Sequence, residues 1–275
     1  MPLPTRYLCV TRQRLKDLAS LSSRKGRRQN GAFLVEGVRS VESAEAAGAP
    51  LAEVLVAHEA AETDRISLLI SRLDARGVPV HRVAAKDMAR VGDARTSQGV
   101  VGVARSIVAP LAPPDRRPGE APAASRVLVL DGVQDPGNVG ALVRTAAWFG
   151  VDAVLADANS ADFEGPKAVR AAMGGLWDVR LSRVDDLGAA LDALRARGLA
   201  LWGAHAAPGS SVPLAEWAPR APSALVMGSE GHGLSEASRQ RLTGGVWIPG
   251  GGGEGAESLN VSVAAGILMH AWVQG

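Results

Sequence analysis

The stretch that decides the fold runs from Arg126 to Gly150 and reads RVLVLDGVQDPGNVGALVRTAAWFG. Its opening letters, RVLVL, form a largely apolar run that indicates a strand buried on both faces, as in a parallel sheet. Pro136 and Gly137 then turn the chain, and Asn138 is predicted to cap a helix that Gly150 ends. A strand, a loop and a helix in this order form the repeating unit of α/β domains.

The same alternation continues to the end of the chain. Further strands are expected over residues 153–156, 177–181, 199–204, 224–227 and 246–248, and helices over 166–173, 185–197, 234–242 and 259–273. Residues 126–275 are therefore predicted to form an α/β domain with a mostly parallel sheet. Ligands of such a sheet bind at the carboxyl ends of its strands.

A smaller α/β domain is predicted over residues 1–105. Its strands are expected over 33–35, 53–57, 78–83 and 99–104, and its helices over 15–21, 38–47 and 66–76. Between the two domains, residues 106–125 read SIVAPLAPPDRRPGEAPAAS. Prolines cannot donate to a sheet or continue a helix, so this segment is predicted to be a semi-rigid linker.

The composition excludes several classes of protein. The chain has 275 residues, of which 47% are hydrophobic and 21% charged, which excludes disorder as the dominant state. It contains no run near the roughly 18 apolar residues that a membrane span needs. A lone cysteine, Cys9, excludes an internal disulfide and a thiolate-rich metal site. The five histidines show no metal-ligand spacing, so no metal is expected.

The positive charge is concentrated at the beginning of the chain. The net charge is +2, but residues 1–40 hold nine Lys and Arg against Asp17 and Glu36, which leaves −5 for the rest. A basic end on a near-neutral body predicts a surface that binds nucleic-acid phosphate. The alternatives are a transit peptide or a solvated helix face. The basic stretch runs directly into FLVEG at 33–37, which favours folded sequence and a cytoplasmic protein, with an organelle left open.

Three polar, glycine-rich segments follow predicted strands: DGVQDPGNVGALVR at 131–144, LVMGSEGHGL at 225–234, and VWIP at 246–249 with ESLNVSVAAG at 257–266. The glycine order of the second segment, G-x-x-G-x-G, differs from the dinucleotide fingerprint, and no Gly-Lys-Ser/Thr follows it. A nicotinamide oxidoreductase is therefore a remote alternative. Taken singly, each segment also fits a capped helix or a mobile loop, and Ser258 is a candidate cap of the last helix.

Taken in order, the three segments resemble the motifs of the SpoU/TrmH family, RNA 2′-O-ribose methyltransferases of the SPOUT superfamily. GPKAVRAAMGG at 165–175 is also similar to the family. GAFLVEG at 31–37 and TSQGVVGV at 96–103 resemble its small substrate-binding domain, which is similar to an L30e-type RNA-binding fold. The resemblance covers nearly the whole chain. It implies a SPOUT domain with a C-terminal trefoil knot, S-adenosylmethionine as cofactor, and a homodimer with sites near its interface.

The resemblance also implies roles for individual residues. The catalytic group would consist of Asn138, Arg144, Glu230, Ser258 and Asn260. The cofactor would be held by Met227, Gly228, Gly231, Ile248, Pro249, Leu259 and Asn260. Arg144 is the family's candidate base or hydroxyl-activating group. Because arginine stays protonated, positioning and electrostatic stabilisation are the physically favoured description.

Two positions depart from the common family pattern. Gly-Ser-Glu-Gly stands at 228–231 in place of Gly-Asn-Glu-Gly, and Ile-Pro-Gly at 248–250 in place of Ile-Pro-Met. The second change precedes a longer glycine-rich loop over 250–255, which bears on cofactor affinity.

The predicted function is methyl transfer from S-adenosylmethionine to a ribose 2′-hydroxyl of RNA, with ribosomal RNA of the 23S type ahead of tRNA. Phosphate contact is assigned to the basic cluster of Arg12, Arg14, Arg24, Lys25, Arg27 and Arg28. A tRNA methyltransferase remains an alternative. A catalytically weak RNA-binding or ribosome assembly factor that retains the fold is another, although all five catalytic positions are present.

Overall fold

The computed structural model describes residues 10–92, 98–110, 125–205, 209, 211–251 and 258–274. The chain divides into two compact units. Unit 1 consists of Met1–Ser106 and Glu164–Trp177, and unit 2 of Ile107–Phe163 and Asp178–Gly275. Most of the predicted linker, residues 111–124, lies outside the described residues.

Unit 1 contains a four-stranded mixed sheet in the order β1-β4-β2-β3. Its strands are β1 (Ala32–Glu36), β2 (Leu51–Ala57), β3 (Val80–Val83) and β4 (Val100–Arg105). Its helices are α1 (Arg12–Ser20), α2 (Arg24–Asn30), α3 (Val38–Ala46), α4 (Asp64–Ala75), α5 (Ala85–Val91) and α7 (Pro166–Ala172). β4 runs antiparallel to β1 and β2, whereas β2 and β3 are parallel. Leu15 and Leu18 of α1 pack with Leu34, Leu55 and Val101 of the sheet.

Unit 2 contains an eight-stranded sheet in which every described strand pair is parallel. The order is β10-β12-β9-β11-β6-β7-β8-β5. The strands are β5 (Val108–Ala109), β6 (Arg126–Asp131), β7 (Ala153–Ala156), β8 (Arg180–Arg183), β9 (Ala200–His205), β10 (Val212–Pro213), β11 (Ser223–Gly228) and β12 (Gly244–Trp247). The helices are α6 (Pro136–Trp148), α8 (Leu187–Ala196), α9 (Glu236–Arg239) and α10 (Val261–Gln274). This confirms the predicted α/β domain with a mostly parallel sheet.

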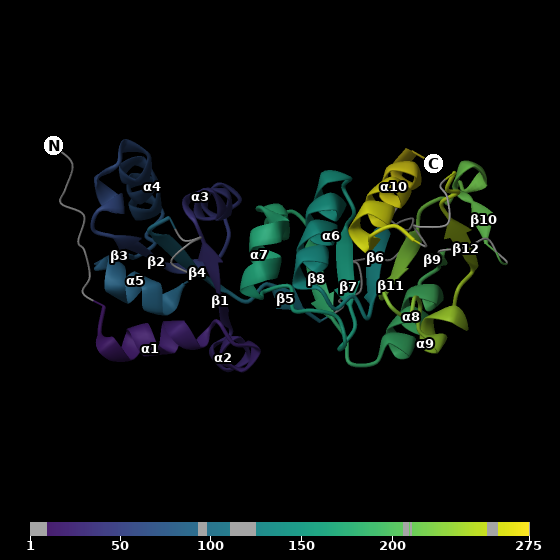
Figure 1. Ribbon diagram of the computed structural model, residues 1–275, viewed down its shortest axis with the longest axis horizontal. Helices are drawn as coiled ribbons and strands as arrows, with labels where there is room; N and C mark the ends of the chain where they lie inside the picture. Colours follow the sequence, from purple (N-terminus) through teal and green to yellow (C-terminus); the bar gives the residue numbers. More distant parts are fainter. Residues whose placement is uncertain are drawn as a thin grey trace, which may run out of the picture. The chain divides into compact units, whose positions relative to one another are not determined.

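Helices cover both faces of the large sheet. Val127 and Val129 of β6 pack with α8, so the alternate residues Leu128 and Leu130, both fully buried, face the other side. On that side α10 lies beside α6, and Trp272 of α10 donates from its indole to Ser223 Oγ of β11 at 2.8 Å (Figure 1). A central strand buried on both faces explains why RVLVL shows no polar alternation.

Several boundaries differ from the sequence prediction. β8 begins at Arg180 because Gly175–Trp177 forms a short 3₁₀-helix. α2 was not predicted because RKGRRQN has no apolar periodicity, and its first turn is capped by Ser23, which accepts from the Gly26 N–H at 3.0 Å. α5 and β5 were also missed, and β5 lies inside the predicted linker. No helix in the described part of the chain has the length and apolarity to cross a membrane.

Candidate active site

The three predicted motifs meet at one edge of the large sheet. β6, β11 and β12 are parallel, and the three motif loops follow their carboxyl ends. β6 leads into the turn before α6, and β11 leads into the loop around Glu230. The chain after β12 leads to Asn260 at the start of α10, although residues 252–257 of this connection lie outside the described residues. This edge is where a parallel sheet places its ligand.

A chain of hydrogen bonds joins one residue from each motif. Asn138 Nδ2 donates to Glu230 Oε1 at 2.6 Å, and Asn260 Nδ2 donates to Asn138 Oδ1 at 3.1 Å. Asn138 is partly buried between the other two, which are exposed. Three of the five predicted catalytic residues are therefore in direct contact, although they lie 92 and 122 residues apart in the sequence.

The cap of α6 is Asp135, so the prediction that Asn138 caps this helix is wrong. Asp135 Oδ1 accepts from the backbone N–H groups of Gly137 and Asn138 at 2.5 and 3.2 Å, and Pro136 occupies the first helical position. Asn138 thus lies within the first turn of α6 and does not cap the helix. Its side-chain amide is free to join the other two motifs.

The cap of α10 is Asn260 and not Ser258 as predicted. Asn260 Oδ1 accepts from the Ser262 N–H at 2.9 Å and from Ser262 Oγ at 2.6 Å. Because this oxygen faces the donors of the helix, the amide nitrogen must point the other way, toward Asn138. The helix backbone therefore fixes the polarity of the whole hydrogen-bonded chain, which ends with Glu230 as an acceptor.

Glu230 stands in a tightly closed loop. Ser229 N–H donates to Gly233 O at 3.0 Å, and Gly233 N–H donates to Ser229 O at 2.9 Å. Gly233 has a φ of +65°, and a Cβ on Gly228 would come within 2.3 Å of the Gly233 carbonyl carbon. Two glycines of this motif are thus required by the loop itself. Gly231 is different, because an added Cβ there would meet no atom within 4 Å.

Two buried acids that the sequence analysis missed hold the loops in place. Asp131 Oδ2 accepts from the Ser235 N–H at 2.7 Å and so ties the end of β6 to the loop after β11. Asp157 Oδ1 accepts from Gly132 N–H at 3.0 Å and from Ser160 Oγ at 2.6 Å. Burial opposes the ionisation of Asp157, but these and further backbone hydrogen bonds outweigh it and lower its pKa. The sequence signal that could have identified these two residues is an aspartate that ends or directly follows an apolar strand.

Arg144 is not part of the hydrogen-bonded chain. Its side chain is exposed and contacts no hydrogen-bonding or ionic partner in the described part of the structure. Arg144 follows Asn138 by six positions on α6. This places the two residues about 9 Å apart along the helix axis and about 240° apart around it. Ser258 and Leu259 are exposed as well, at the start of the segment that leads into α10.

The residues assigned to the cofactor border the same edge. Met227 and Gly228 end β11, Gly231 lies in the loop that follows, and Ile248 and Pro249 follow β12. Met227 is buried, whereas Leu259 is 50% exposed. Added Cβ atoms at Gly250 and Gly251 would, as at Gly231, meet nothing within 4 Å. Within the described residues, neither packing nor a positive φ requires these three glycines, so this part of the edge presents open backbone that a ligand can approach.

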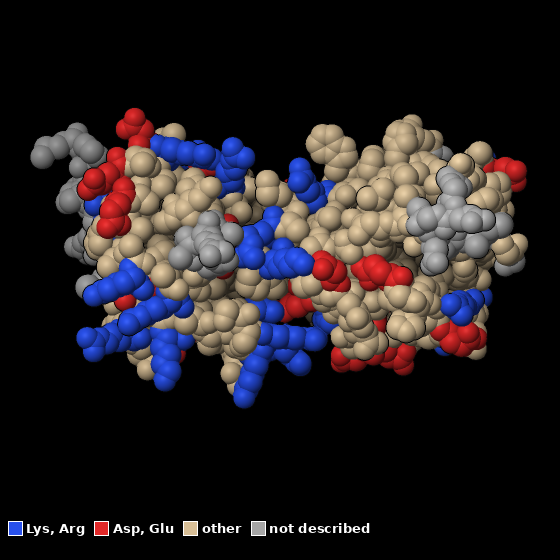
Figure 2. All heavy atoms as spheres, in the orientation of Figure 1, with Lys and Arg blue, Asp and Glu red and all other residues tan. Residues whose placement is uncertain are grey.

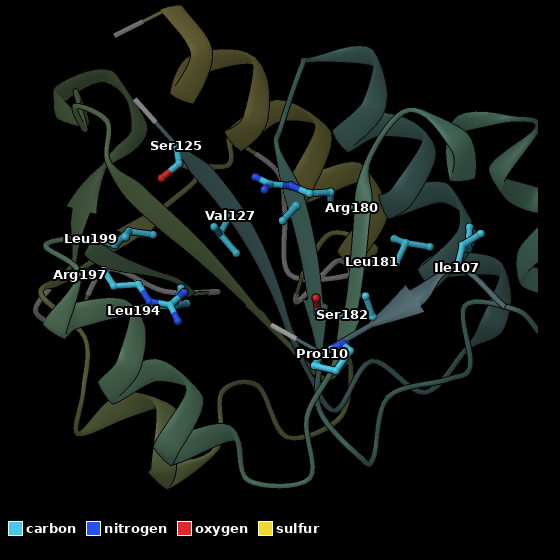
Figure 3. A pocket seen from close by; sticks show the side chains of 12 residues that line it. Ile107, Pro110, Ser125, Val127, Arg180, Leu181, Ser182, Leu194, Arg197 and Leu199 are labelled. Carbon is cyan, nitrogen blue, oxygen red and sulfur yellow. The ribbon is translucent and has the colours of Figure 1, made fainter. Parts of the chain in front are cut away.

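A cavity of about 160 Å³ lies elsewhere in unit 2 (Figure 3). It is lined by Ser125 and Val127 of the β6 region, by Arg180 of β8, and by Leu194 and Leu199 beside α8. These residues lie at the amino ends of the strands, opposite the edge where the motifs meet. The cavity is mostly apolar and takes no part in the site described above.

The basic cluster of unit 1 is only partly exposed. Figure 2 shows Lys and Arg gathered over α1 and α2. Four of the six predicted RNA-binding residues are exposed and have no partner in the described part of the chain: Arg12, Arg24, Lys25 and Arg28. Arg14 is paired with Glu53, its Nε lying 2.9 Å from Oε1. Arg27 is buried and donates to the carbonyls of Leu21 and Ser22 at 2.9 and 3.0 Å, which removes it from the surface.

Comparison with known proteins gives the class. The model of the SpoU rRNA Methylase family matches residues 125–270, and that of the MRM3-like substrate binding domain matches residues 12–102. The 23S rRNA (guanosine(2553)-2′-O)-methyltransferase RlmP of Bacillus subtilis is 31% identical over 261 residues, 94% of this chain and 95% of the relative.

Two solved structures are similar over almost the whole chain. The SpoU methyltransferase AviRb from Streptomyces viridochromogenes, in complex with AdoMet, has a TM-score of 0.79 at 25% identity and covers 96% of this chain and 98% of its own. An AdoMet-bound rRNA methyltransferase from Sinorhizobium meliloti has a TM-score of 0.79 at 25% identity, with 97% and 96% covered.

The fold and the site define an S-adenosylmethionine-dependent RNA 2′-O-methyltransferase with a small substrate-binding domain. The chain belongs to the SpoU rRNA methylase family. This membership confirms the predicted reaction class, the predicted cofactor and the two-domain organisation that the motifs indicated.

Proposed function

We propose that this methyltransferase acts on ribosomal RNA and that its reaction takes place at the carboxyl edge of the eight-stranded sheet. The observation that carries the proposal is the Glu230–Asn138–Asn260 hydrogen-bonded chain, which joins all three motifs at that edge. RlmP is a 23S rRNA methyltransferase and the Sinorhizobium meliloti enzyme an rRNA methyltransferase, which supports rRNA over tRNA as the substrate.

The cofactor is assigned to the open backbone of this edge. The glycines at 231, 250 and 251 leave room that no atom of the described residues fills, and the half-exposed side chain of Leu259 offers an apolar surface for an adenine ring. Met227, Gly228, Ile248, Pro249 and Asn260 complete the set. When bound, S-adenosylmethionine supplies an electrophilic methyl group on a sulfonium.

The chain's own residues hold the ribose. Asn138 and Asn260 are locked in one orientation by α10, so their remaining polar atoms are aimed before the substrate arrives. Glu230 is the acceptor at the end of the hydrogen-bonded chain, and Ser258 is exposed two residues before Asn260 in the third motif. Arg144 stays charged and stabilises negative charge on the ribose oxygen or on the neighbouring phosphate.

A second copy of the chain is proposed to cover α6 and α10. Three large apolar side chains are exposed there, namely Trp148 (84%), Val263 (52%) and Ile267 (37%). Apolar side chains exposed on adjacent helices are typical of a surface that another chain buries. Arg144 stands one turn before Trp148 on α6, so a copy seated there would bring both chains close to Arg144. A C-terminal knot and a cytoplasmic location remain part of the proposal.

RNA is proposed to lie along α1 and α2 of unit 1, which we call the basic ledge and define by Arg12, Lys16, Arg24, Lys25 and Arg28. All five side chains are exposed and have no partner in the described part of the chain. Two arginines of α4 are instead neutralised, since Arg65 pairs with Glu42 at 2.5 Å and Arg72 with Glu45 at 3.2 Å. Unpaired cations are those that phosphate can bind without first breaking an ion pair.

The basic ledge is tested with two matched double variants. Arg24→Gln with Arg28→Gln removes two unpaired charges, whereas Arg65→Gln with Arg72→Gln removes two paired ones. Affinity for protein-free 23S rRNA is measured between 50 and 300 mM salt. The first variant is expected to reduce the salt slope by about two, and the second to leave it nearly unchanged. Equal slopes in both variants would contradict this assignment.

A further inference from the structure

We infer that Arg239, which the family motifs leave unassigned, holds a phosphate of the RNA next to the reacting ribose. Arg239 ends the short helix α9, directly after the loop that carries Glu230. Its Nη2 lies 3.9 Å from the position where a Cβ on Gly233 would stand, so the guanidinium is against the backbone of that loop. This inference rests on the proposed function and adds a contact to it.

The charge of Arg239 is available. Its side chain is exposed and has no hydrogen-bonding or ionic partner in the described part of the structure. The nearest acid on its own helix, Glu236, accepts from Gln240 Nε2 at 2.9 Å. The positive charge of Arg239 acts on His205 at the carboxyl end of β9. The pKa of His205 is lowered first by burial and second by this charge.

Two other arginines at this edge of unit 2, Arg241 and Arg183, are engaged by protein groups. Arg241 Nε binds Asp192 Oδ2 at 3.0 Å, and its Nη1 donates to Ala237 O at 2.9 Å. Arg183 donates to the backbone carbonyls of the turn after β7, at 3.2, 2.8 and 2.5 Å. Among the residues described at the carboxyl edge, Arg239 is thus available to an external anion in addition to Arg144, which is assigned to the ribose.

An RNA phosphate is the anion that this position fits. Every ribose inside an RNA chain carries a phosphate on its 5′ and on its 3′ side, so a cation beside the methylation site meets one. The same edge presents the exposed carboxylates of Asp135, Glu230 and Glu236, which repel a polyanion. Arg239 offsets this repulsion where the ribose must approach. An exposed position also suits a polyanion better than the single carboxylate of the cofactor.

The test compares Arg239→Gln with Arg195→Gln in the full chain. Arg195, near the end of α8, is equally exposed and without a partner in the described part, but α8 runs back to the opposite edge of the sheet. Binding of protein-free 23S rRNA and of S-adenosylhomocysteine is measured for each, together with the melting temperature. Arg239→Gln is expected to weaken RNA binding about tenfold and to reduce the salt slope by about one, with unchanged cofactor binding.

Arg195→Gln is expected to match the wild type, and Arg239→Lys to recover most of the affinity, because lysine keeps the charge. RNA binding and salt slope equal to the wild type in Arg239→Gln would overturn the inference. So would a loss confined to S-adenosylhomocysteine, which would make the anion the cofactor carboxylate. These binding results are independent of catalysis. Failure of the wild type to methylate rRNA would count against the proposed function and not against the phosphate contact.

Discussion

Replacing Asn138 by aspartate tests the hydrogen-bonded chain that unites the three motifs. Aspartate has the size of asparagine but no amide donor, so a carboxylate would face the carboxylate of Glu230 where a 2.6 Å hydrogen bond now stands. The oxygen that accepts from Asn260 is retained. Only one of the two hydrogen bonds is therefore lost, and a like-charge contact takes its place.

The expected magnitude follows from the position of the pair. Two unit charges about 4 Å apart repel by about 1 kcal/mol in water and about 4 kcal/mol near a protein surface of effective dielectric 20. Glu230 is exposed and Asn138 partly buried, so the repulsion is taken as about 2 kcal/mol. Loss of the hydrogen bond adds about 1 kcal/mol. The free energy of unfolding is expected to fall by about 3 kcal/mol in total.

Urea unfolding at low salt measures this change in the free energy of unfolding. The decisive comparison is a double variant in which the amide and the carboxylate exchange places. In Asn138→Asp combined with Glu230→Gln, the new amide can donate to the new carboxylate, so the contact returns with opposite polarity. Because the double variant removes the repulsion and restores the hydrogen bond, a coupling energy of about 3 kcal/mol is expected from the double-mutant cycle. Gln134→Glu adds the same charge to an exposed position of the same loop and should change stability by less than about 0.5 kcal/mol. Strict additivity of the two substitutions would refute the contact.

Three further predictions concern Asp157, Arg144 and Arg27. Asp157→Asn should destabilise the protein by about 2 kcal/mol at pH 7. Because the pKa of Asp157 is lowered by folding, its contribution is present above about pH 4 and is lost as the pH falls through the lowered pKa; a difference in urea unfolding that does not shrink as the pH is lowered below about 4 would contradict this. Arg144→Ala should reduce methyl transfer at least a hundredfold with nearly unchanged S-adenosylhomocysteine affinity, and full activity would remove its assigned role. Arg27→Met should lower stability by about 2 kcal/mol by leaving two carbonyls without a donor, and should leave the salt slope of RNA binding unaltered; a reduced slope would return Arg27 to the RNA surface.

Most strands and helices of the large α/β domain, and its mostly parallel sheet, could be predicted because their signals are local. RVLVL is buried on both faces, and the αL glycine at 150, with a φ of +67°, ends α6 as expected. The elements that were missed lack such signals. α2 is almost entirely polar and depends on the cap at Ser23, while β5 is two residues long and exists through its pairing with β8. Propensity and periodicity carry no information about such pairings.

Sequence analysis identified the residues of the candidate site more accurately than it identified their arrangement. The three motifs identified Asn138, Glu230 and Asn260, which the structure joins. The caps were misassigned because Asp135 and Asn138 are both good N-cap residues, and only the Pro136 position of the helix start distinguishes them. Burial of Arg27 could not be read from RKGRRQN, because all of its arginines look alike until the turn after α1 presents its carbonyls.

The most direct test of the central claim is methyl transfer from labelled S-adenosylmethionine to separated rRNA and tRNA that lack the modification, followed by nucleoside analysis. A labelled 2′-O-methylnucleoside in the rRNA pool is the predicted result. Label confined to tRNA would contradict the proposed substrate, and a labelled base would contradict the ribose as the site of transfer. Absence of label from both pools, with no binding of S-adenosylhomocysteine, would contradict the active enzyme and favour an RNA-binding scaffold.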